Sequence, residues 1–318
     1  MKNQFTVFSY SKANKCGFAV PEEYRELLSG YEERHGKIVK QRKRTGGFDF
    51  MAAIRIVSLV IFVVALVMLV VNIYEYVRDV QYNEVQNRSV AVSSKAQESL
   101  TIRDTPVYPT YEGEEISNTR FDYPEVCDRD NLKQFALTYK DFKFWLYIED
   151  TYVNYPVVQA SDNEYYLHRN MDGETNKAGT LFLDYRCNAK TMGGHTIVYG
   201  HSMQNGTMFG TLNKYNNNYE YYTQHPVFYT YTDTEVTAWR IFSVYVTNTN
   251  DDYTRTRFSS KAEYQSFIDT LIARSDYDTG VEVTSADDIM TFSTCYIYVH
   301  TNGRFVVHAV KVGTTPWE

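Results

Sequence analysis

One long apolar run lies near the N-terminus of the 318-residue chain. Between Ile56 and Ile73 only Ser58 and Asn72 are polar. A helix rises about 1.5 Å per residue, so this run reaches roughly 27 Å, close to the hydrocarbon thickness of a bilayer. A core helix is rarely apolar on every side for so long, and a cleaved signal peptide starts nearer the N-terminus. The pattern predicts a retained transmembrane helix over residues 51–77.

Beyond residue 130 the hydrophobic pattern changes. A helical rhythm over Asn131–Leu146 gives way to short β-branched and aromatic runs separated by turn residues. Eight of these runs predict strands: Trp145–Ile148, Val153–Val158, Thr180–Asp184, Thr196–Tyr199, Val227–Tyr231, Ala238–Val246, Ile289–Thr294 and Phe305–Val312. Eight short strands with few helices indicate a mostly β fold, a small closed or nearly closed barrel.

One helix is predicted among the strands. Ser260 and Glu263 have the spacing of a capping box, in which the two residues cap a helix N-terminus reciprocally. Four apolar residues then follow at the spacing of one helix face: Tyr264, Phe267, Ile268 and Leu271. We therefore expect a helix over residues 261–274, directly before the seventh strand.

Charge predicts the orientation of the chain in a membrane. Residues 1–55 carry 11 Lys and Arg against 6 Asp and Glu, and the remainder carries 21 against 33. The charge is therefore +5 before the apolar run and −12 after it, within the net charge of −7. The positive-inside rule places the N-terminus in the cytoplasm and the larger part outside the cell. An acidic external part argues against nucleic acid as a partner.

These patterns divide the chain into four segments. Residues 1–50 are predicted to be a cytoplasmic tail with a short helix at Pro21–Leu28, and residues 51–77 the single span of a cell-membrane protein. Residues 78–129 are predicted to be a polar stalk, helical at first and irregular later. Residues 130–318 are predicted to form the folded extracellular domain.

Three chemically capable side chains lie at strand ends. His201 follows the fourth predicted strand, Cys295 ends the seventh and Arg304 precedes the eighth. A thiolate attacks an amide carbonyl, an imidazole protonates the departing amine, and a guanidinium stabilises the oxyanion. Strand alternation puts Cys295 on the same face as Thr291 and Ser293. Together the three side chains are the parts of a cysteine acyl-transfer site.

Each candidate also has an ordinary structural interpretation. A lone cysteine is most often a buried small hydrophobe, and a histidine at a strand end is often a turn residue. His300 and His308 are rival partners for the thiol because both are near it in sequence. His308 shares the face of Arg304 four residues further along the strand, so we expect it in the barrel wall.

No cofactor is predicted, and metal binding is a poor alternative because no Cys-x-x-Cys or His-x-x-x-His spacing occurs. Cys16 would be cytoplasmic, and Cys127, Cys187 and Cys295 would be extracellular. An odd number of external thiols leaves at least one unpaired within the chain. Whether Cys127 and Cys187 pair is open at this point.

Several segments together resemble the sortase family. Thr291–Cys295 resembles the T-L-x-T-C motif that carries the sortase cysteine, with Phe292 in place of the usual Leu. Val198–His201 and Gly303–Val307 resemble the segments that carry the sortase His and Arg. Three further stretches resemble class B sortases in particular: Tyr155–Gln159, Asn163–Leu167 and Gly179–Arg186. The resemblance covers roughly residues 130–318.

The resemblance implies an eight-stranded sortase-type β-barrel with N-terminal helices, anchored by one transmembrane helix in a Gram-positive bacterium. It implies a cysteine transpeptidase, of the peptidase-type hydrolases EC 3.4.22, with Cys295 as nucleophile, His201 as general acid and base, and Arg304 as oxyanion or substrate stabiliser. Such an enzyme cleaves a C-terminal sorting signal, N-P-x-T-x or L-P-x-T-G-like, on surface proteins. It transfers the acyl group to an amine of a peptidoglycan precursor or a pilin.

One position departs from the class B pattern. Many members carry an acidic residue directly after the cysteine, and this chain has Tyr296. Two other functions stay open: a membrane-anchored cysteine protease, which shares the acylation step, and a catalytically inert barrel that serves as a surface binding module with Cys295 buried.

Overall fold

The computed structural model describes residues 22, 50–92, 123–296 and 302–317. Its residues fall into two compact units, Met1–Val70 and Val71–Glu318. The second unit holds the last turns of helix α3 together with all eight strands. The helix predicted at Pro21–Leu28 lies outside the described residues except for Glu22, and so do His300 and residues 93–122 of the predicted stalk.

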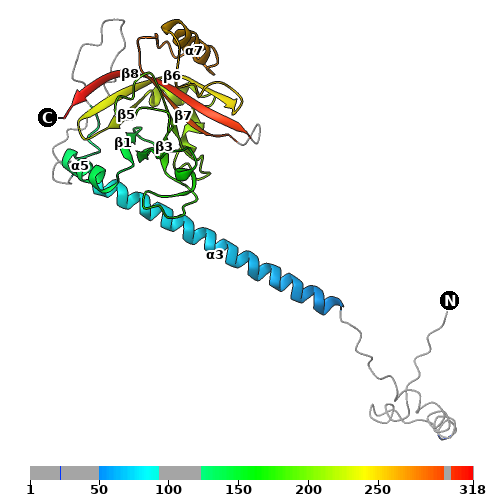
Figure 1. Cartoon of the computed structure of the whole chain (residues 1–318). Coiled ribbons are helices and arrows are strands. Elements are labelled where there is room, and N and C mark those ends of the chain that lie inside the picture. Colours follow the sequence, from blue (N-terminus) through cyan, green and yellow to red (C-terminus); the bar gives the residue numbers. More distant parts are fainter. Residues whose placement is uncertain (1–21, 23–49, 93–122, 297–301, 318) are drawn as a thin grey trace, which may run out of the picture. The chain divides into compact units, whose positions relative to one another are not determined.

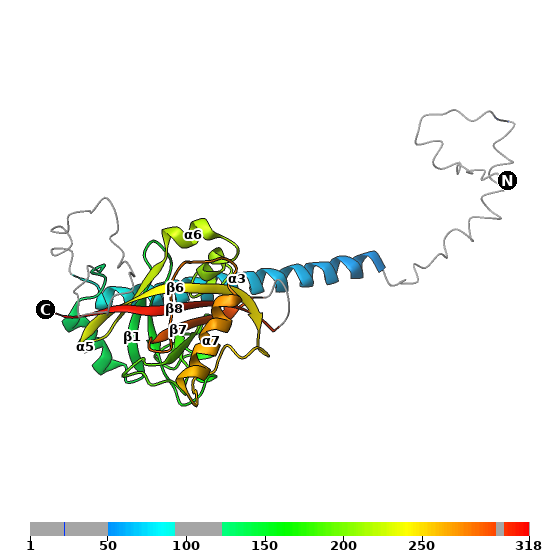
Figure 2. The same cartoon turned by 90° about the horizontal axis from the view of Figure 1, so that it is seen from above.

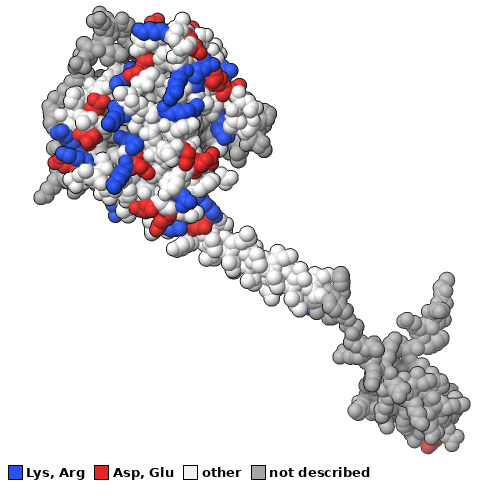
Figure 3. Space-filling model, viewed as in Figure 1, with Lys and Arg blue, Asp and Glu red and all other residues white. Residues whose placement is uncertain are grey.

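The apolar run lies within α3, a single helix from Phe50 to Val90. Among the described helices it is the one that is long and apolar enough to cross a membrane. Its apolar side chains from Ile56 to Ile73 are exposed, and Figure 3 shows this part of the helix without charged residues. An apolar surface of this kind is compatible with membrane anchoring.

The eight strands form a closed barrel in the order β1-β2-β3-β4-β7-β8-β6-β5. Strand β2 pairs in parallel with β3, and β4 with β7, while the other neighbours are antiparallel. The strands are β1 (Phe142–Tyr147), β2 (Asn154–Val158), β3 (Leu181–Leu183), β4 (His195–Tyr199), β5 (Val227–Tyr231), β6 (Glu235–Asn248), β7 (Ile289–Cys295) and β8 (Gly303–Pro316). The predicted barrel and its eight strands are confirmed (Figure 1).

The helical prediction over Asn131–Leu146 is wrong in its second half. Helix α5 spans Arg129–Thr138, capped by the side chain of Asp128, which accepts from the backbone N–H of Asn131 at 2.9 Å. A turn then leads into β1, whose aromatic residues pack on both sides of the sheet. Bulky aromatic side chains suit a two-sided strand, and this packing outweighs the local helical spacing.

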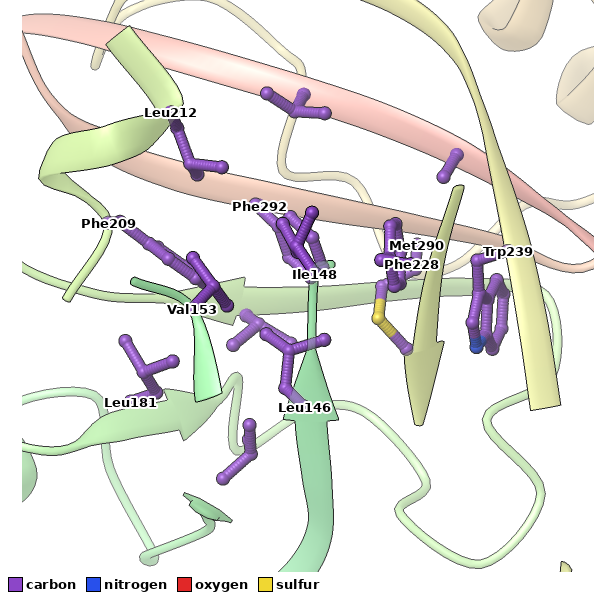
Figure 4. Packing of buried hydrophobic residues seen from close by; sticks show 14 of the residues in the cluster. Leu146, Ile148, Val153, Leu181, Phe209, Leu212, Phe228, Trp239, Met290 and Phe292 are labelled. Carbon is purple, nitrogen blue, oxygen red and sulfur yellow. The ribbon is translucent and has the colours of Figure 1, made fainter. Parts of the chain in front are cut away.

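The barrel interior is a single apolar cluster. Side chains from β1, β4, β6, β7 and β8 meet there, as Figure 4 shows for Leu146, Met290 and Phe292. The residues between these on β7 face outwards, as strand alternation predicts. The outer layer is α7 (Lys261–Ala273), which lies over β6, β7 and β8 (Figures 1 and 2).

Helix α7 confirms the prediction for residues 261–274. Its four predicted apolar residues are buried against the strands. The Ser260 side chain accepts from the backbone N–H of Glu263 at 3.1 Å, as a capping box requires. The Glu263 carboxylate returns to the backbone N–H of Ser259 rather than Ser260, at 2.6 Å, so the cap is reciprocal but displaced by one residue.

Three short helical segments were not predicted. They are η1 (Tyr165–His168), η2 (Gly210–Tyr215) and α6 (Tyr219–Gln224). Each is no longer than six residues, which is too short to show a hydrophobic period.

The layer between the barrel and α7 contains a buried network of hydrogen-bonded polar side chains. The ring of His195 donates from Nδ1 to the backbone carbonyl of Arg255 at 2.6 Å, so its Nε2 accepts from the Thr291 hydroxyl at 2.7 Å. That hydroxyl in turn accepts from Nδ1 of His308 at 2.7 Å. His308 is fully buried, which confirms it as a barrel-wall residue. Both rings are therefore neutral: His195 donates from Nδ1 and accepts at Nε2, and His308 donates from Nδ1.

The buried network of His195, Thr291 and His308 should make the free energy of unfolding fall as the pH is lowered. Burial lowers the pKa of His195 from 6.5 to about 4, so below pH 6.5 the unfolded chain binds more protons than the folded chain. The contribution is complete above pH 6.5 and is lost as the pH falls towards 4. Between pH 7.5 and 5.0 we expect a loss of about 2 kcal/mol from His195, measured by urea unfolding in a non-ionic detergent.

The matched variant is His195→Gln, whose amide retains one donor and one acceptor and does not titrate. Its unfolding free energy should fall less over the same pH interval. Equal slopes for the two proteins would show that His195 is not the group responsible.

The three cysteines in the described part of the chain do not pair with one another. Cys127 lies in the apolar cluster around α5, Cys187 contacts the barrel interior, and both are free thiols, as is Cys295. The possible Cys127–Cys187 disulfide is therefore absent from the described part of the chain.

Candidate active site

The strand order brings the three candidate residues to one end of the barrel. Strand β7 lies between β4 and β8, so the segments that carry His201, Cys295 and Arg304 are neighbours. His201 is far in sequence from Cys295, and the parallel β4–β7 pair connects their two segments. The antiparallel β7–β8 pair connects the segments of Cys295 and Arg304.

His201 and Cys295 lie at the same level on neighbouring segments. Strand β4 pairs Tyr199 with Ser293, and the same offset two residues later relates His201 to Cys295. Two hydrogen bonds continue the pairing beyond the strand: Gly200 N–H donates to the Ser293 carbonyl at 3.3 Å, and the Thr294 hydroxyl donates to the Gly200 carbonyl at 2.7 Å. Backbone pairing thus brings the segment that carries His201 alongside the end of β7, which carries Cys295.

Cys295 and Arg304 are direct partners across the antiparallel pair. Residues in this position have Cα atoms about 4.5 to 5.5 Å apart, and their side chains leave the same face of the sheet. The Arg304 guanidinium donates to the carbonyl of Gly303 at 2.9 Å. Among the described residues no carboxylate forms an ion pair with it, so its remaining N–H groups are available to an anion.

A tyrosine that the sequence did not single out borders this face. Tyr253 is buried, and its hydroxyl lies 3.0 Å from that of Ser293, which shares the face of Cys295. The pKa of Tyr253 is raised, because burial outweighs the bond to Ser293 and the charge of Arg304, which lower it. Tyr253 comes from the loop after β6, and nothing in its sequence neighbourhood relates it to the strand ends.

A backbone carbonyl orients the ring of His201. Its Nε2 donates to the carbonyl oxygen of Leu167 at 2.7 Å, which leaves Nδ1 as the nitrogen that exchanges a proton. The ring of His168 stacks on it, with ring centroids 5.4 Å apart and planes at 27°. The pKa of His201 is lowered: burial and the neighbouring His168 lower it, and the bond to the Leu167 carbonyl only partly opposes them. The orienting group is therefore a neutral carbonyl on η1.

The position of that carbonyl depends on Gly179. Gly179 has a φ of +60°, and a Cβ there would lie 2.5 Å from the Leu167 oxygen and 2.6 Å from the Tyr166 oxygen. Glycine is the residue that adopts this conformation without strain and leaves this space. Close packing of the two segments thus requires glycine at this point.

A buried carboxylate ties the same loop to the end of β4. Asp184 accepts from the Arg186 guanidinium at 2.7 and 2.8 Å, from Asn163 at 3.0 Å and from the Tyr199 hydroxyl at 3.0 Å. Burial raises the pKa of Asp184, but the bonds from Arg186 outweigh it and hold the pKa below its usual value. Asn163 begins the segment that leads to η1, and Tyr199 directly precedes Gly200-His201. One ionised carboxylate therefore joins the segment that leads to η1 to the end of β4, which precedes His201.

Tyr296 faces away from Arg304. It packs against the barrel interior, and its hydroxyl accepts from the side chain of Asn216 at 2.9 Å. Its ring centroid lies 6.1 Å from that of Phe305. The residue after the cysteine thus joins the strand to η2 and supplies no carboxylate to the site.

Comparisons with known proteins show the family to which the chain belongs. A sortase domain model matches residues 146–312, more than half of the chain. The chain belongs to the sortase family. Sortase B of Listeria monocytogenes is 36% identical over 167 residues, which are 52% of this chain and 68% of that protein.

Solved sortase B structures show the same fold. One from Bacillus anthracis, in complex with AAEK1, is 40% identical, with a TM-score of 0.53, over 57% of this chain and 84% of that one. The Staphylococcus aureus sortase B–substrate complex is 33% identical, with a TM-score of 0.55, over 58% and 86%. The predicted class B resemblance is confirmed, and with it a cysteine transpeptidase of the cell-wall anchoring type.

Proposed function

We propose that Cys295, His201 and Arg304 are the catalytic residues of this sortase and that its donor is the C-terminal sorting signal of a surface protein. The observation that carries the proposal is the strand order β4-β7-β8, which aligns the three residues at one barrel end. The other external thiols lie in apolar surroundings that raise their pKa, to about 11 for Cys187. A thiol with a raised pKa is a poor nucleophile at neutral pH.

The reaction follows from these groups. The Cys295 thiolate attacks the scissile amide carbon, and a C–S bond forms while the oxyanion accepts hydrogen bonds from Arg304. His201, protonated on Nδ1, gives its proton to the departing amine as the C–N bond breaks. An acceptor amine then attacks the thioester, returns a proton to His201 and releases the thiolate. Water in place of the amine gives hydrolysis.

The acceptor and the cellular setting belong to the same proposal. We infer an amine of a peptidoglycan precursor or a pilin as acceptor, with N-P-x-T-x or L-P-x-T-G-like peptides as donors. Residues 1–50 would be a cytoplasmic tail, 51–77 the membrane span, 78–129 a stalk and 130–318 the catalytic domain outside the cell. The apolar helix and the excess of positive charge before it support this arrangement.

The test is intact-protein mass spectrometry of the full chain in detergent micelles with a panel of sorting peptides. The expected result is an acyl adduct that maps to Cys295 and disappears when an amine such as triglycine is added, with formation of the ligated peptide. Hydrolysis unaffected by any amine would indicate a protease instead. No adduct with any peptide, and alkylation of Cys295 no faster than of Cys187, would indicate an inert barrel.

A further inference from the structure

The loop that orients His201 is tightly connected within itself. It spans residues 163–180 and includes η1 and a turn closed by the bridge between Arg169 and Thr175. Asn176 N–H donates to the His168 carbonyl at 3.0 Å, and Thr180 N–H donates to the Tyr166 carbonyl at 3.0 Å. Residues 175–180 therefore determine where η1, and with it the Leu167 carbonyl, is placed.

Helix α3 contacts this loop from its other side, through the last turn of the proposed membrane span and the turns that follow it. Lys177 pairs with Glu75 and donates to the side-chain oxygen of Asn72 at 3.1 Å. The Arg78 guanidinium donates to the backbone carbonyl of Thr175 at 3.1 Å. These contacts lie immediately on both sides of Asn176, the residue that bonds to His168.

The contact continues along the same helix face. Tyr82 is half-buried, and burial together with Asp172 raises its pKa. Asp79, one turn earlier, is buried with 8% of its surface exposed and pairs with Arg78 at 3.4 Å. Beside this contact lies a groove of about 570 Å³ between α3 and the barrel, lined by Tyr152, Asn154 and Met203 among others. The 163–180 loop therefore contacts these turns of the helix directly, through Lys177 and Thr175.

We propose that the turns of α3 from Asn72 to Tyr82 position the catalytic imidazole, with Lys177 and Arg78 as positioning residues that act through the 163–180 loop. The proposal rests on the catalytic role of His201 proposed above. The Lys177 side chain is 61% exposed and that of Glu75 is 28% exposed. A partly exposed ion pair contributes little to stability, and we assign to this one an effect on the placement of the Leu167 carbonyl. An acid–base group must be held within about 0.5 Å of its productive position. A small shift of the Leu167 carbonyl would displace the imidazole and lower the rate.

The test is a charge swap in the full chain in detergent micelles. Lys177→Glu and Glu75→Lys should each lower the kcat of acylation about three- to tenfold, with KM little changed. The double variant, which restores an opposite pair, should recover most of the loss. The matched control is the Glu84–Arg88 pair, which is exposed and lies wholly within α3. Its single charge reversals, Glu84→Lys and Arg88→Glu, should leave kcat unchanged.

Two further readouts separate positioning from folding. The pH dependence of Cys295 alkylation, which needs no substrate, should shift in the single variants and return in the double variant. The thermal midpoint should change equally for the test and control pairs. Unchanged kcat in the single variants, or a loss that follows the unfolded fraction without recovery in the swap, would overturn the proposal. If the wild-type chain forms no thioester with any peptide, the proposed function fails instead, and the alkylation profile still reports on the coupling.

Discussion

Replacement of Cys295 by alanine should abolish acylation, with a fall in cleavage of a sorting peptide of at least about 10³-fold. In the proposed mechanism the thiol forms the only bond between enzyme and acyl group, so no neighbouring residue can replace it. Cys295 is half-buried at a strand end, and its small side chain leaves no large cavity when it is shortened. The variant should therefore keep the unfolding free energy of the wild type, and the loss should be one of chemistry alone.

The other two cysteines of the barrel unit, Cys127 and Cys187, provide matched controls. Cys127→Ala and Cys187→Ala remove thiols of the same size from apolar surroundings that disfavour the thiolate. Both variants should retain peptide cleavage, measured by chromatography of the products with and without triglycine. Retained cleavage in the Cys295 variant, or loss of cleavage in the Cys187 variant, would show that Cys295 is not the nucleophile.

The barrel could be predicted from the sequence because strand alternation is a local signal. Seven residues of β7 show it directly: Ile289 packs under α7, while Met290 and Phe292 fill the barrel. The same argument placed His308 in the wall. Where two periods overlap, as between Thr138 and Phe142, the local pattern does not mark the change from helix to strand, and contacts made by distant residues decide it.

The candidate site was predictable for the side chains that lie in short motifs, but not for Tyr253, which comes from the loop after β6. Cys295, His201 and Arg304 each belong to a short motif, and the strand order brings them together. The group that orients His201 is a backbone carbonyl, and every residue has one, so no residue type identifies it. Its place depends on hydrogen bonds between segments, and Leu167 could be connected with His201 only through the three-dimensional structure.

The Tyr296 departure has a consistent explanation. Position 296 lies on the barrel side of the strand, where Tyr296 packs and accepts a hydrogen bond from Asn216, whereas Cys295 and Arg304 share the opposite face. Arg304 keeps N–H groups that the proposed mechanism assigns to the oxyanion, and the imidazole is oriented by a carbonyl rather than by a charge. A neutral orienting group does not by itself raise the histidine pKa as strongly as a carboxylate does. The burial that lowers this pKa therefore prevails.

Gly179→Ala should lower kcat/KM for acylation about 10²-fold, because displacement of a catalytic group by about 1 Å has an effect of this size. The new Cβ would meet the carbonyl oxygens of Tyr166 and Leu167 at 2.6 and 2.5 Å, so the segment that orients His201 must move. The left-handed backbone also costs an alanine roughly 1–2 kcal/mol, whatever surrounds it. The control must therefore carry the same backbone cost without the contact.

Gly280→Ala is that control, since its φ is +66° and no atom lies within 4 Å of an added Cβ. Both variants should lose a similar backbone contribution to the free energy of unfolding, measured by urea unfolding. Acylation should fall steeply in the Gly179 variant alone, with a changed pH dependence of Cys295 alkylation. Equal activity in the two folded variants would show that the Leu167 carbonyl is not needed to orient His201, because a displaced carbonyl would then leave the imidazole as effective as before.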